Sequence, residues 1–253
     1  SGIPTYSEEL IDYRRDYSET DLVRLVRTLR PEFAPGERFN YSNTGYILLG
    51  VIVRAVSGEF YGDFLRTRVW QPLGMSTARV ISEHDIVPHR AAGYTLDGDA
   101  LRNQSWVSPV LNTTADGSLY LSLRDYIAWD RGIRRGAVLS DSSWRMSFTR
   151  APMLGGRTAP YGFGWFVDSA GGAPYIHHGG SWQGFQVFYG RYARHDLSIV
   201  VLTNLAQGDP QRISEQLAAV IDPALAIPLP PEASREALER RVRAVLAKAA
   251  SGG

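Results

Sequence analysis

Residues 161–203 read YGFGWFVDSAGGAPYIHHGGSWQGFQVFYGRYARHDLSIVVLT, and this stretch decides the fold. It holds four short segments rich in aromatic and β-branched residues, the composition of β-strands: 161–168, 173–178, 182–189 and 197–203. Glycine pairs at 171–172 and 179–180 and a polar triplet at 194–196 punctuate them, as expected for turns. The stretch therefore predicts an antiparallel meander.

Helices are expected on both sides of this meander. Apolar residues recur at helical spacing in 21–30, 43–57, 59–70 and 211–221, and a capping-box-like start lies at 122–125. The segment 43–57 is apolar nearly all round, so we expect it to be buried. Residues 76–120 show no clear period and predict loops with small elements. The fold class is therefore α+β, with an antiparallel sheet flanked by helices plus a mainly helical lobe.

The domain organisation follows from the composition of the last thirty residues. Residues 1–222 form one predicted domain, and the proline-rich segment 223–231 predicts a stiff linker. Residues 232–253 predict an amphipathic helix and tail, with Leu238, Val242, Val245 and Leu246 on one side. That helix either packs back on the domain or docks on a partner.

Charge and composition exclude several function classes. The 253 residues carry 27 basic and 26 acidic side chains, so the net charge of +1 gives no reason to expect nucleic acid as a partner. Without cysteine there are no disulfides or thiolate nucleophiles. The longest apolar run is far below the ~20 residues that span a bilayer. His84, Asp85 and His89 could be read as metal ligands, but scattered polar loop residues are the commoner explanation, and we expect no metal and no organic cofactor.

Two motifs could carry chemistry. Tyr41-Ser42-Asn43 follows the turn Pro35-Gly36 and leads straight into helix 43–57; taken alone, Ser42 or Asn43 is explained as a helix N-cap. His177-His178-Gly179-Gly180-Ser181 lies on the meander; taken alone, it is a glycine-rich hairpin with a surface histidine. Because successive side chains of a strand point to opposite faces, at most one of the two histidines can face a cleft.

Together, the two motifs resemble those of the serine β-lactamase, penicillin-binding-protein and esterase superfamily. Its members carry a Ser-x-x-Lys nucleophile, a Tyr-x-Asn element and a Lys-Thr-Gly or His-x-Gly strand; Tyr41–Asn43 matches the second and His178–Gly180 the third. Further segments match in the same order along 1–222: Ser1–Pro4, Pro72–Met75, Tyr161–Trp165 and Leu202–Asn204. The resemblance implies a β-lactamase/transpeptidase-like fold, here lacking the N-terminal strands and the nucleophile helix.

The resemblance also implies roles for individual residues. Tyr41 would be the general base or proton shuttle, which requires cationic neighbours because a phenol has a pKa of about 10 in water. Asn43 would orient the lysine and hold a substrate carbonyl. The backbone N–H of Ser181 would be one of two oxyanion donors, the other being the nucleophile's own N–H. Gly179 and Gly180 would let substrate lie close against the strand edge, with Trp182 beside them.

The sequence departs from the family pattern at the nucleophile. Its only lysine is Lys248, and the residue three positions earlier is Val245, so no Ser-x-x-Lys is present. We expect the motif upstream of Ser1 in a parent protein, on a segment that would be this chain's partner. Without that segment, apolar faces of the meander and of helix 43–57 would be exposed. The alternative is a non-catalytic binding or regulatory member or fragment; a Ser181–His178 dyad lacks the Gly-x-Ser-x-Gly elbow and is disfavoured.

His178 bears on the substrate. Many β-lactamases have a lysine at this position, which stays charged at neutral pH, whereas histidine, with a reference pKa of about 6.5, is mostly neutral there. A neutral imidazole anchors a substrate carboxylate poorly. The sequence therefore favours small-molecule esters, amides or D-amino peptides over efficient β-lactam hydrolysis. Relatives are often extracytoplasmic, which favours a periplasmic or secreted location.

Overall fold

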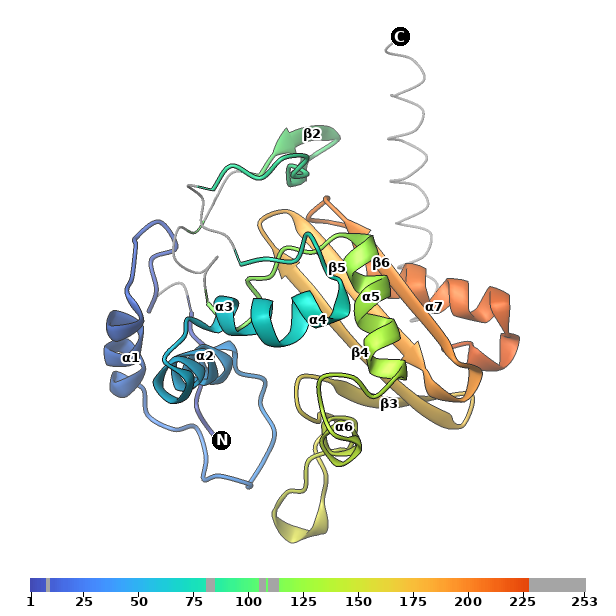
Figure 1. Ribbon diagram of the computed structural model, residues 1–253, viewed down its shortest axis with the longest axis horizontal. Helices are drawn as coiled ribbons and strands as arrows, with labels where there is room; N and C mark the ends of the chain where they lie inside the picture. The colour runs from blue at the N-terminus through green and yellow to red at the C-terminus, as the bar shows by residue number, and fades with distance from the viewer. Residues whose placement is uncertain (8–9, 81–84, 105–107, 109–113, 228–253) are drawn as a thin grey trace. The chain divides into compact units, whose positions relative to one another are not determined.

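The computed structural model describes residues 1–7, 10–80, 85–104, 108 and 114–227. The chain forms two compact units, and each is described by itself (Figure 1). The first unit comprises residues 1–90, 106–168 and 176–178; the second comprises 91–105, 169–175 and 179–253. No helix within the described ranges has the length and apolar character needed to cross a membrane.

The first unit is mainly helical. Its elements are α1 (Glu19–Thr28), α2 (Asn43–Ser57), α3 (Tyr61–Leu65), a π-helical turn (Arg66–Trp70), α4 (Gln71–Leu73), α5 (Leu123–Arg134) and α6 (Asp141–Ser147). α1 and α5 each begin at a serine capping box, at Ser18 and Ser122. The first starts two residues before the predicted range, and the second starts where the sequence indicated. An ion pair of 2.9 Å between Arg54 and Glu19 links α2 to α1.

The helix predicted at 59–70 extends beyond residue 70 in the structure. The chain stays helical from α3 through the π-helical turn to Leu73. Pro72, which has no backbone N–H to donate, follows the π-helical turn and does not end the helix. The helix ends instead at Gly74, which takes the left-handed conformation with φ 73°.

Helix α2 has the predicted bounds but not the predicted burial. Its N-cap is Ser42, whose side chain accepts a hydrogen bond from the Gly45 N–H, and its C-cap is the left-handed Gly58. Only Thr44, Ile47 and Gly50 are buried. The outer apolar residues are exposed, with Leu49 at 49%, Ile52 at 54% and Val56 at 84%. The expectation of a fully buried helix is therefore wrong for this chain, because its own residues cover only one stripe of α2.

The meander predicted from the sequence is a four-stranded sheet. Its strands are β3 (Phe166–Ala170), β4 (Ala173–Trp182), β5 (Phe185–Tyr192) and β6 (Leu197–Thr203), and they neighbour one another in that order. β5 and β6 are antiparallel, with Phe188 opposite Val201 and Gly190 opposite Ile199. A separate hairpin in the second unit is formed by β1 (Tyr94–Asp97) and β2 (Ala100–Asn103).

The strand boundaries differ from the prediction at both ends of β3, at the end of β4 and at both ends of β5. Residues 161–165, expected to be strand, form a tight turn in which the Gly162 N–H donates to the Trp165 carbonyl at 2.8 Å and Gly164 is left-handed with φ 80°. The glycine pair 179–180, expected to punctuate the strands, lies inside β4. The reversal comes at Gln183–Gly184, with φ 47° and 83°, because those two residues adopt the left-handed backbone that a tight hairpin needs.

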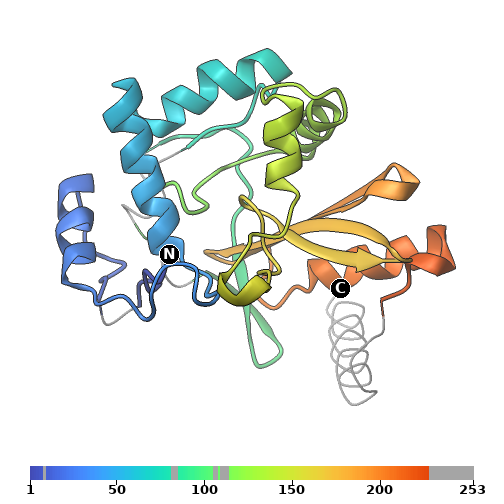
Figure 2. The ribbon, with the colours of Figure 1, turned by 90° about the horizontal axis from the view of Figure 1, so that it is seen from below.

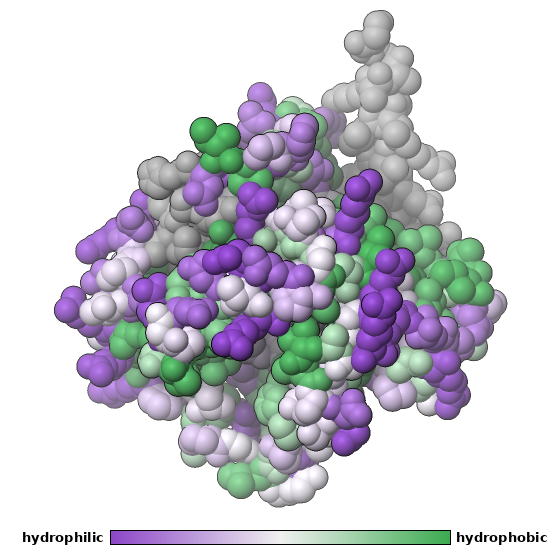
Figure 3. All heavy atoms as spheres, viewed as in Figure 1, coloured by the Kyte–Doolittle hydropathy of each residue, from purple (hydrophilic) through white to green (hydrophobic). Residues whose placement is uncertain are grey.

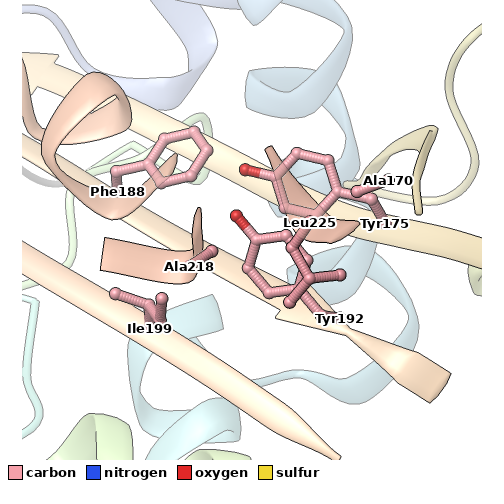
Figure 4. Close-up of a cluster of buried hydrophobic side chains, with 7 residues drawn as sticks. All are labelled: Ala170, Tyr175, Phe188, Tyr192, Ile199, Ala218 and Leu225. Carbon is pink, nitrogen blue, oxygen red and sulfur yellow. The ribbon is translucent and has the colours of Figure 1, made fainter. Parts of the chain in front are cut away.

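The second unit has its core between the sheet and α7 (Pro210–Ile221), which packs along β5 and β6 (Figures 1 and 2). Figure 4 shows the buried cluster: Ala170, Tyr175, Phe188, Tyr192, Ile199, Ala218 and Leu225. The rings of Tyr175 and Tyr192 stack with centroids 4.6 Å apart. The outer face of α7 carries exposed apolar side chains (Figure 3): Ile213, Leu217, Val220 and Ile221.

The start of the predicted linker takes part in this core. Residues Pro223–Leu225 form a 3₁₀ turn, and Leu225 is 0% exposed. The rest of the predicted linker, from 228 on, and the predicted helix 232–250 lie outside the described residues. The division of the chain at 222 remains a prediction.

The β1–β2 hairpin is anchored at its base. The Tyr94 N–H donates to the Asn204 carbonyl and the Ala206 N–H donates to the Tyr94 carbonyl, each at 2.9 Å. Beside them Gly93 lies so close to the β4–β5 turn that a Cβ on it would be 2.1 Å from the Gln183 carbonyl oxygen. Only glycine permits this approach of two backbones.

Candidate active site

Asn43 is positioned by the start of the chain. It is the first residue of α2, and its backbone N–H donates to the Thr5 hydroxyl at 3.3 Å. Its side chain is hydrogen-bonded to the Tyr6 hydroxyl. Because Ser42 supplies the helix cap, the Asn43 amide is not used for capping. The two residues that follow the Ser1–Pro4 segment therefore hold the predicted Tyr-x-Asn element.

Tyr41 and His178 lie together in the first unit. Their ring centroids are 6.0 Å apart, and the Tyr41 ring also packs edge-on against Tyr161 at 5.9 Å and parallel to Phe166 at 6.4 Å. Burial raises the pKa of Tyr41, and the neighbouring Tyr46 and Asp116 raise it further. Every one of these influences favours the neutral phenol. None of the groups that shift the pKa of Tyr41 is a cation. For Tyr41 to accept a proton at neutral pH, a nearby cation would have to lower its pKa.

His177 and His178 have separate environments. The Nε2 of His178 is 2.9 Å from the Tyr161 hydroxyl. His177 is buried, and its Nε2 is 2.9 Å from an Asp168 carboxylate oxygen. Arg150 holds the other oxygen of that carboxylate at 3.1 Å. His178 is thus the histidine that meets Tyr41, while His177 contacts Asp168, which is ion-paired with Arg150.

Gly179, Gly180, Ser181 and Trp182 belong to the second unit, at the end of β4. The Ser181 hydroxyl accepts a hydrogen bond of 2.8 Å from the Gln186 amide, which also donates to the Ala206 carbonyl at 2.9 Å. Gln186 thereby ties Ser181 to the loop after β6. Gly180 lies in close contact with β5, since a Cβ there would be 3.0 Å from a Val187 methyl group.

Asp116 is a site neighbour that the sequence did not reveal. It accepts a hydrogen bond of 2.8 Å from the Tyr6 hydroxyl and one of 2.5 Å from the Thr114 hydroxyl. Burial raises the pKa of the Asp116 carboxyl, and these hydrogen bonds oppose that effect. Through Tyr6, this carboxyl is connected to Asn43. Asp116 lies in the stretch 76–120, where no periodic pattern singled it out.

Metal ligation receives no support from the described part of the chain. There, no three or more His, Asp and Glu side chains come together in a way that could hold an ion. Asp85 and His89 are described, but His84 lies outside the described residues, so the metal-ligand reading of these three remains untested.

Known proteins share both the sequence pattern and the fold. The family model described as Beta-lactamase matches residues 1–221. "Penicillin-binding protein 4*" of Bacillus subtilis is 29% identical, over 81% of this chain and 49% of the relative. "D-aminopeptidase" of Gluconobacter oxydans is 31% identical, over 83% of this chain and 39% of the relative. The crystal structure of a penicillin-binding protein from Bacillus halodurans superposes with a TM-score of 0.73 at 24% identity, over 88% of this chain and 69% of that one.

The chain spans half or less of the length of the curated relatives it matches. The solved structure has the same β-lactamase/transpeptidase-like fold, which confirms the predicted α+β class. The family model covers nearly nine-tenths of the sequence, through the end of α7. The chain therefore belongs to the β-lactamase family.

Proposed function

We propose that this chain is the larger, C-terminal part of a serine hydrolase that cleaves amides, esters or D-amino peptides through an acyl-enzyme. The observation that carries the proposal is the pairing of Tyr41 with His178, 6.0 Å apart between ring centroids in one unit, beside Asn43. The printed names of relatives, a D-aminopeptidase among them, support amide or peptide substrates.

The chemistry assigns one task to each residue. Tyr41, in its anionic form, takes the proton of the nucleophilic serine hydroxyl as that oxygen bonds to the substrate carbonyl carbon. The Ser181 N–H stabilises the oxyanion that forms, and Asn43 orients the lysine and the substrate carbonyl. Collapse of this intermediate breaks the bond to the leaving amine or alcohol, which takes the proton back. Water then releases the acyl group by the same steps.

The nucleophile would come from a segment outside this sequence. No Ser-x-x-Lys is present in the 253 residues, and the raised pKa of Tyr41 calls for a nearby cation, which the lysine of that motif would supply. The exposed apolar residues of α2 support the same view, because a further segment could cover them: Leu49, Ile52 and Val56.

Fluorophosphonate labelling tests the proposal. Intact-mass spectrometry of the native protein after incubation with a fluorophosphonate is expected to show a second polypeptide, or a longer parent chain, carrying one adduct. An unmodified chain of 28.0 kDa without a companion would instead support a non-catalytic binding or regulatory role. That alternative is favoured by one observation, the absence of a Ser-x-x-Lys in the sequence.

The substrate preference has its own prediction. A short-chain nitrophenyl ester is expected to have a higher kcat/KM than a chromogenic cephalosporin, because a neutral His178 gives the cephalosporin carboxylate no charged partner. A hydrogen bond to a charged group contributes about 1.5–3 kcal/mol, or about 10- to 100-fold. His178→Lys is the matched variant and should raise the relative rate for the cephalosporin. Faster cephalosporin than ester hydrolysis by the unaltered protein would refute the preference.

A further inference from the structure

We propose that Asp116 is a positioning residue of the hydrolase site: its carboxylate fixes the Tyr6 hydroxyl, so that Thr5 and Tyr6 hold Asn43 at the start of α2. All four residues belong to the first unit. The inference deepens the proposed function and rests on it for the effect on catalysis. The positioning itself can be tested without the nucleophile.

The loop that carries Asp116 is held against two helices. A Cβ on Gly50 of α2 would lie 2.5 Å from the Ala115 Cβ, so the helix and this loop approach as closely as a glycine allows. From α3, the buried Tyr61 hydroxyl donates to the Thr114 carbonyl at 2.7 Å. The backbone on both sides of the Asp116 side chain is therefore fixed relative to α2 and α3.

Both oxygens of the Asp116 carboxylate accept a hydrogen bond from a hydroxyl. Tyr6 donates to Oδ2 at 2.8 Å, and Thr114 donates to Oδ1 at 2.5 Å. These two donors favour the carboxylate over the neutral acid, and a hydrogen bond to a carboxylate is about twice as strong as one between neutral groups. The ring of Tyr6 is held as well, because it meets Tyr13 edge-on with centroids 6.4 Å apart.

Asn43 has two contacts with the segment that Asp116 holds. Its backbone N–H donates to the Thr5 hydroxyl at 3.3 Å. Its side chain is hydrogen-bonded to the Tyr6 hydroxyl, and this bond lowers the pKa of Tyr6, in opposition to burial and Asp116, which raise it. A donor to the phenol oxygen has that effect, because it stabilises the phenolate. The amide nitrogen of Asn43 therefore faces Tyr6, and the carbonyl oxygen is the end that suits a lysine ammonium.

The charge of Asp116 does not assist Tyr41. Burial and Tyr46 raise the pKa of Tyr41, and Asp116 raises it further. The carboxylate thus disfavours the tyrosine anion that the proposed chemistry needs. A favourable contribution of Asp116 to catalysis must therefore come from the atoms that it holds in place, and these include the Tyr6 hydroxyl.

¹H–¹⁵N NMR spectra of the protein labelled with ¹⁵N only in its asparagines test the positioning. The chain has five asparagines, at positions 40, 43, 103, 112 and 204, so the side-chain amide signals are few. Asn43→Ser identifies the Asn43 signals by their loss. Asp116→Leu keeps a branched side chain of similar size and removes both acceptor oxygens, so it should shift the Asn43 side-chain signals.

The decisive comparison is Asp116→Leu in two backgrounds. In the unaltered protein it should shift the Asn43 side-chain signals, because it releases the Tyr6 hydroxyl. In Tyr6→Phe it should add little to the shift, because the connection is already broken. Asp116→Asn keeps one acceptor oxygen and should have a smaller effect than Asp116→Leu. This conservative variant also gives a result if the leucine variant folds poorly.

Asp130→Asn is the matched control. Asp130 is a partly buried carboxylate of the first unit that pairs with Arg134 within α5 at 2.6 Å, so its change should leave the Asn43 signals where they are. Unshifted Asn43 signals in both Asp116 variants would overturn the proposal. An Asp116→Leu shift of equal size with and without Tyr6→Phe would overturn it too, as would shifts of all the asparagine signals, which indicate a general disturbance of the fold.

The complete hydrolase provides a second readout. Tyr6→Phe and Asp116→Leu should each lower kcat for ester hydrolysis by up to about 100-fold, the cost of displacing a positioned group by about 1 Å. KM should change less, and the double variant should be no slower than the slower single variant. An unchanged kcat, or losses that multiply in the double variant, would refute action through Tyr6. Because the NMR comparison needs no nucleophile, the proposed activity can fail while the positioning stands, and the positioning can fail while the activity stands.

Discussion

Tyr41→Phe is expected to lower kcat for ester hydrolysis by about 10²- to 10⁴-fold, the usual contribution of a general acid–base group. The change removes a single oxygen and keeps the ring, which packs against Tyr161, Phe166 and His178. Folding should therefore be little affected, and the loss should appear in kcat more than in KM. The measurement is steady-state hydrolysis of a short-chain nitrophenyl ester by the complete hydrolase, with the nucleophile-bearing segment present.

Tyr120→Phe is the matched control for Tyr41→Phe. Tyr120 is another partly buried tyrosine of the first unit; it bridges to Arg79 through its backbone and lies beneath the Arg90 guanidinium. It should retain nearly full activity. A loss below about tenfold in Tyr41→Phe, or a loss of similar size in the control, would remove Tyr41 from the proposed chemistry.

Leu225→Ala should lower the free energy of unfolding by about 2–5 kcal/mol, the usual cost of emptying a fully buried leucine site. Leu225 is 0% exposed and packs with Ala218, Tyr175 and Tyr192 in the core of the second unit (Figure 4). A residue in a solvated linker would cost far less to truncate. Urea unfolding followed by circular dichroism measures the difference.

Leu217→Ala gives the matched comparison for Leu225→Ala. Leu217 lies on α7 with 47% of its surface exposed, and alanine is at least as good a helix former as leucine. The expected cost is below about 1 kcal/mol. Equal costs at the two positions would show that Leu225 is no part of the core and that the domain ends before it, as its proline-rich sequence suggested.

The fold was largely accessible from the sequence, because its decisive features are local. Strand β6 and helix α2 have the predicted bounds, since a short run of β-branched residues and a serine cap act over a few residues. The wrong strand boundaries also arise because the prediction uses only local sequence. Gly179 and Gly180 are predicted to interrupt the strands, but glycine only permits a turn; the reversal lies at Gln183–Gly184, where the backbone is left-handed.

The candidate site was accessible only in part. Tyr41, Asn43 and His178 were found because they belong to short motifs whose chemistry is recognisable. Tyr6 and Asp116 are 110 positions apart in the sequence and meet only in the folded chain, so no local pattern could pair them. The hydroxyl of Tyr161 was likewise hidden, because its motif was predicted to be strand and only the observed turn directs it to His178.

The close approach at Gly93 has a consequence for how this sequence can vary. Every missense change of a glycine codon introduces at least a Cβ, and at position 93 that atom would lie only 2.1 Å from the carbonyl oxygen of Gln183. At the hairpin tip, Gly98 has open space around its Cβ direction, but its φ of 58° makes any other side chain strained there. The hairpin base is therefore restricted by a backbone ninety residues away, whereas its tip is restricted only by its own local conformation. A gene duplicated from this one could acquire a new hairpin sequence while inheriting the same hinge.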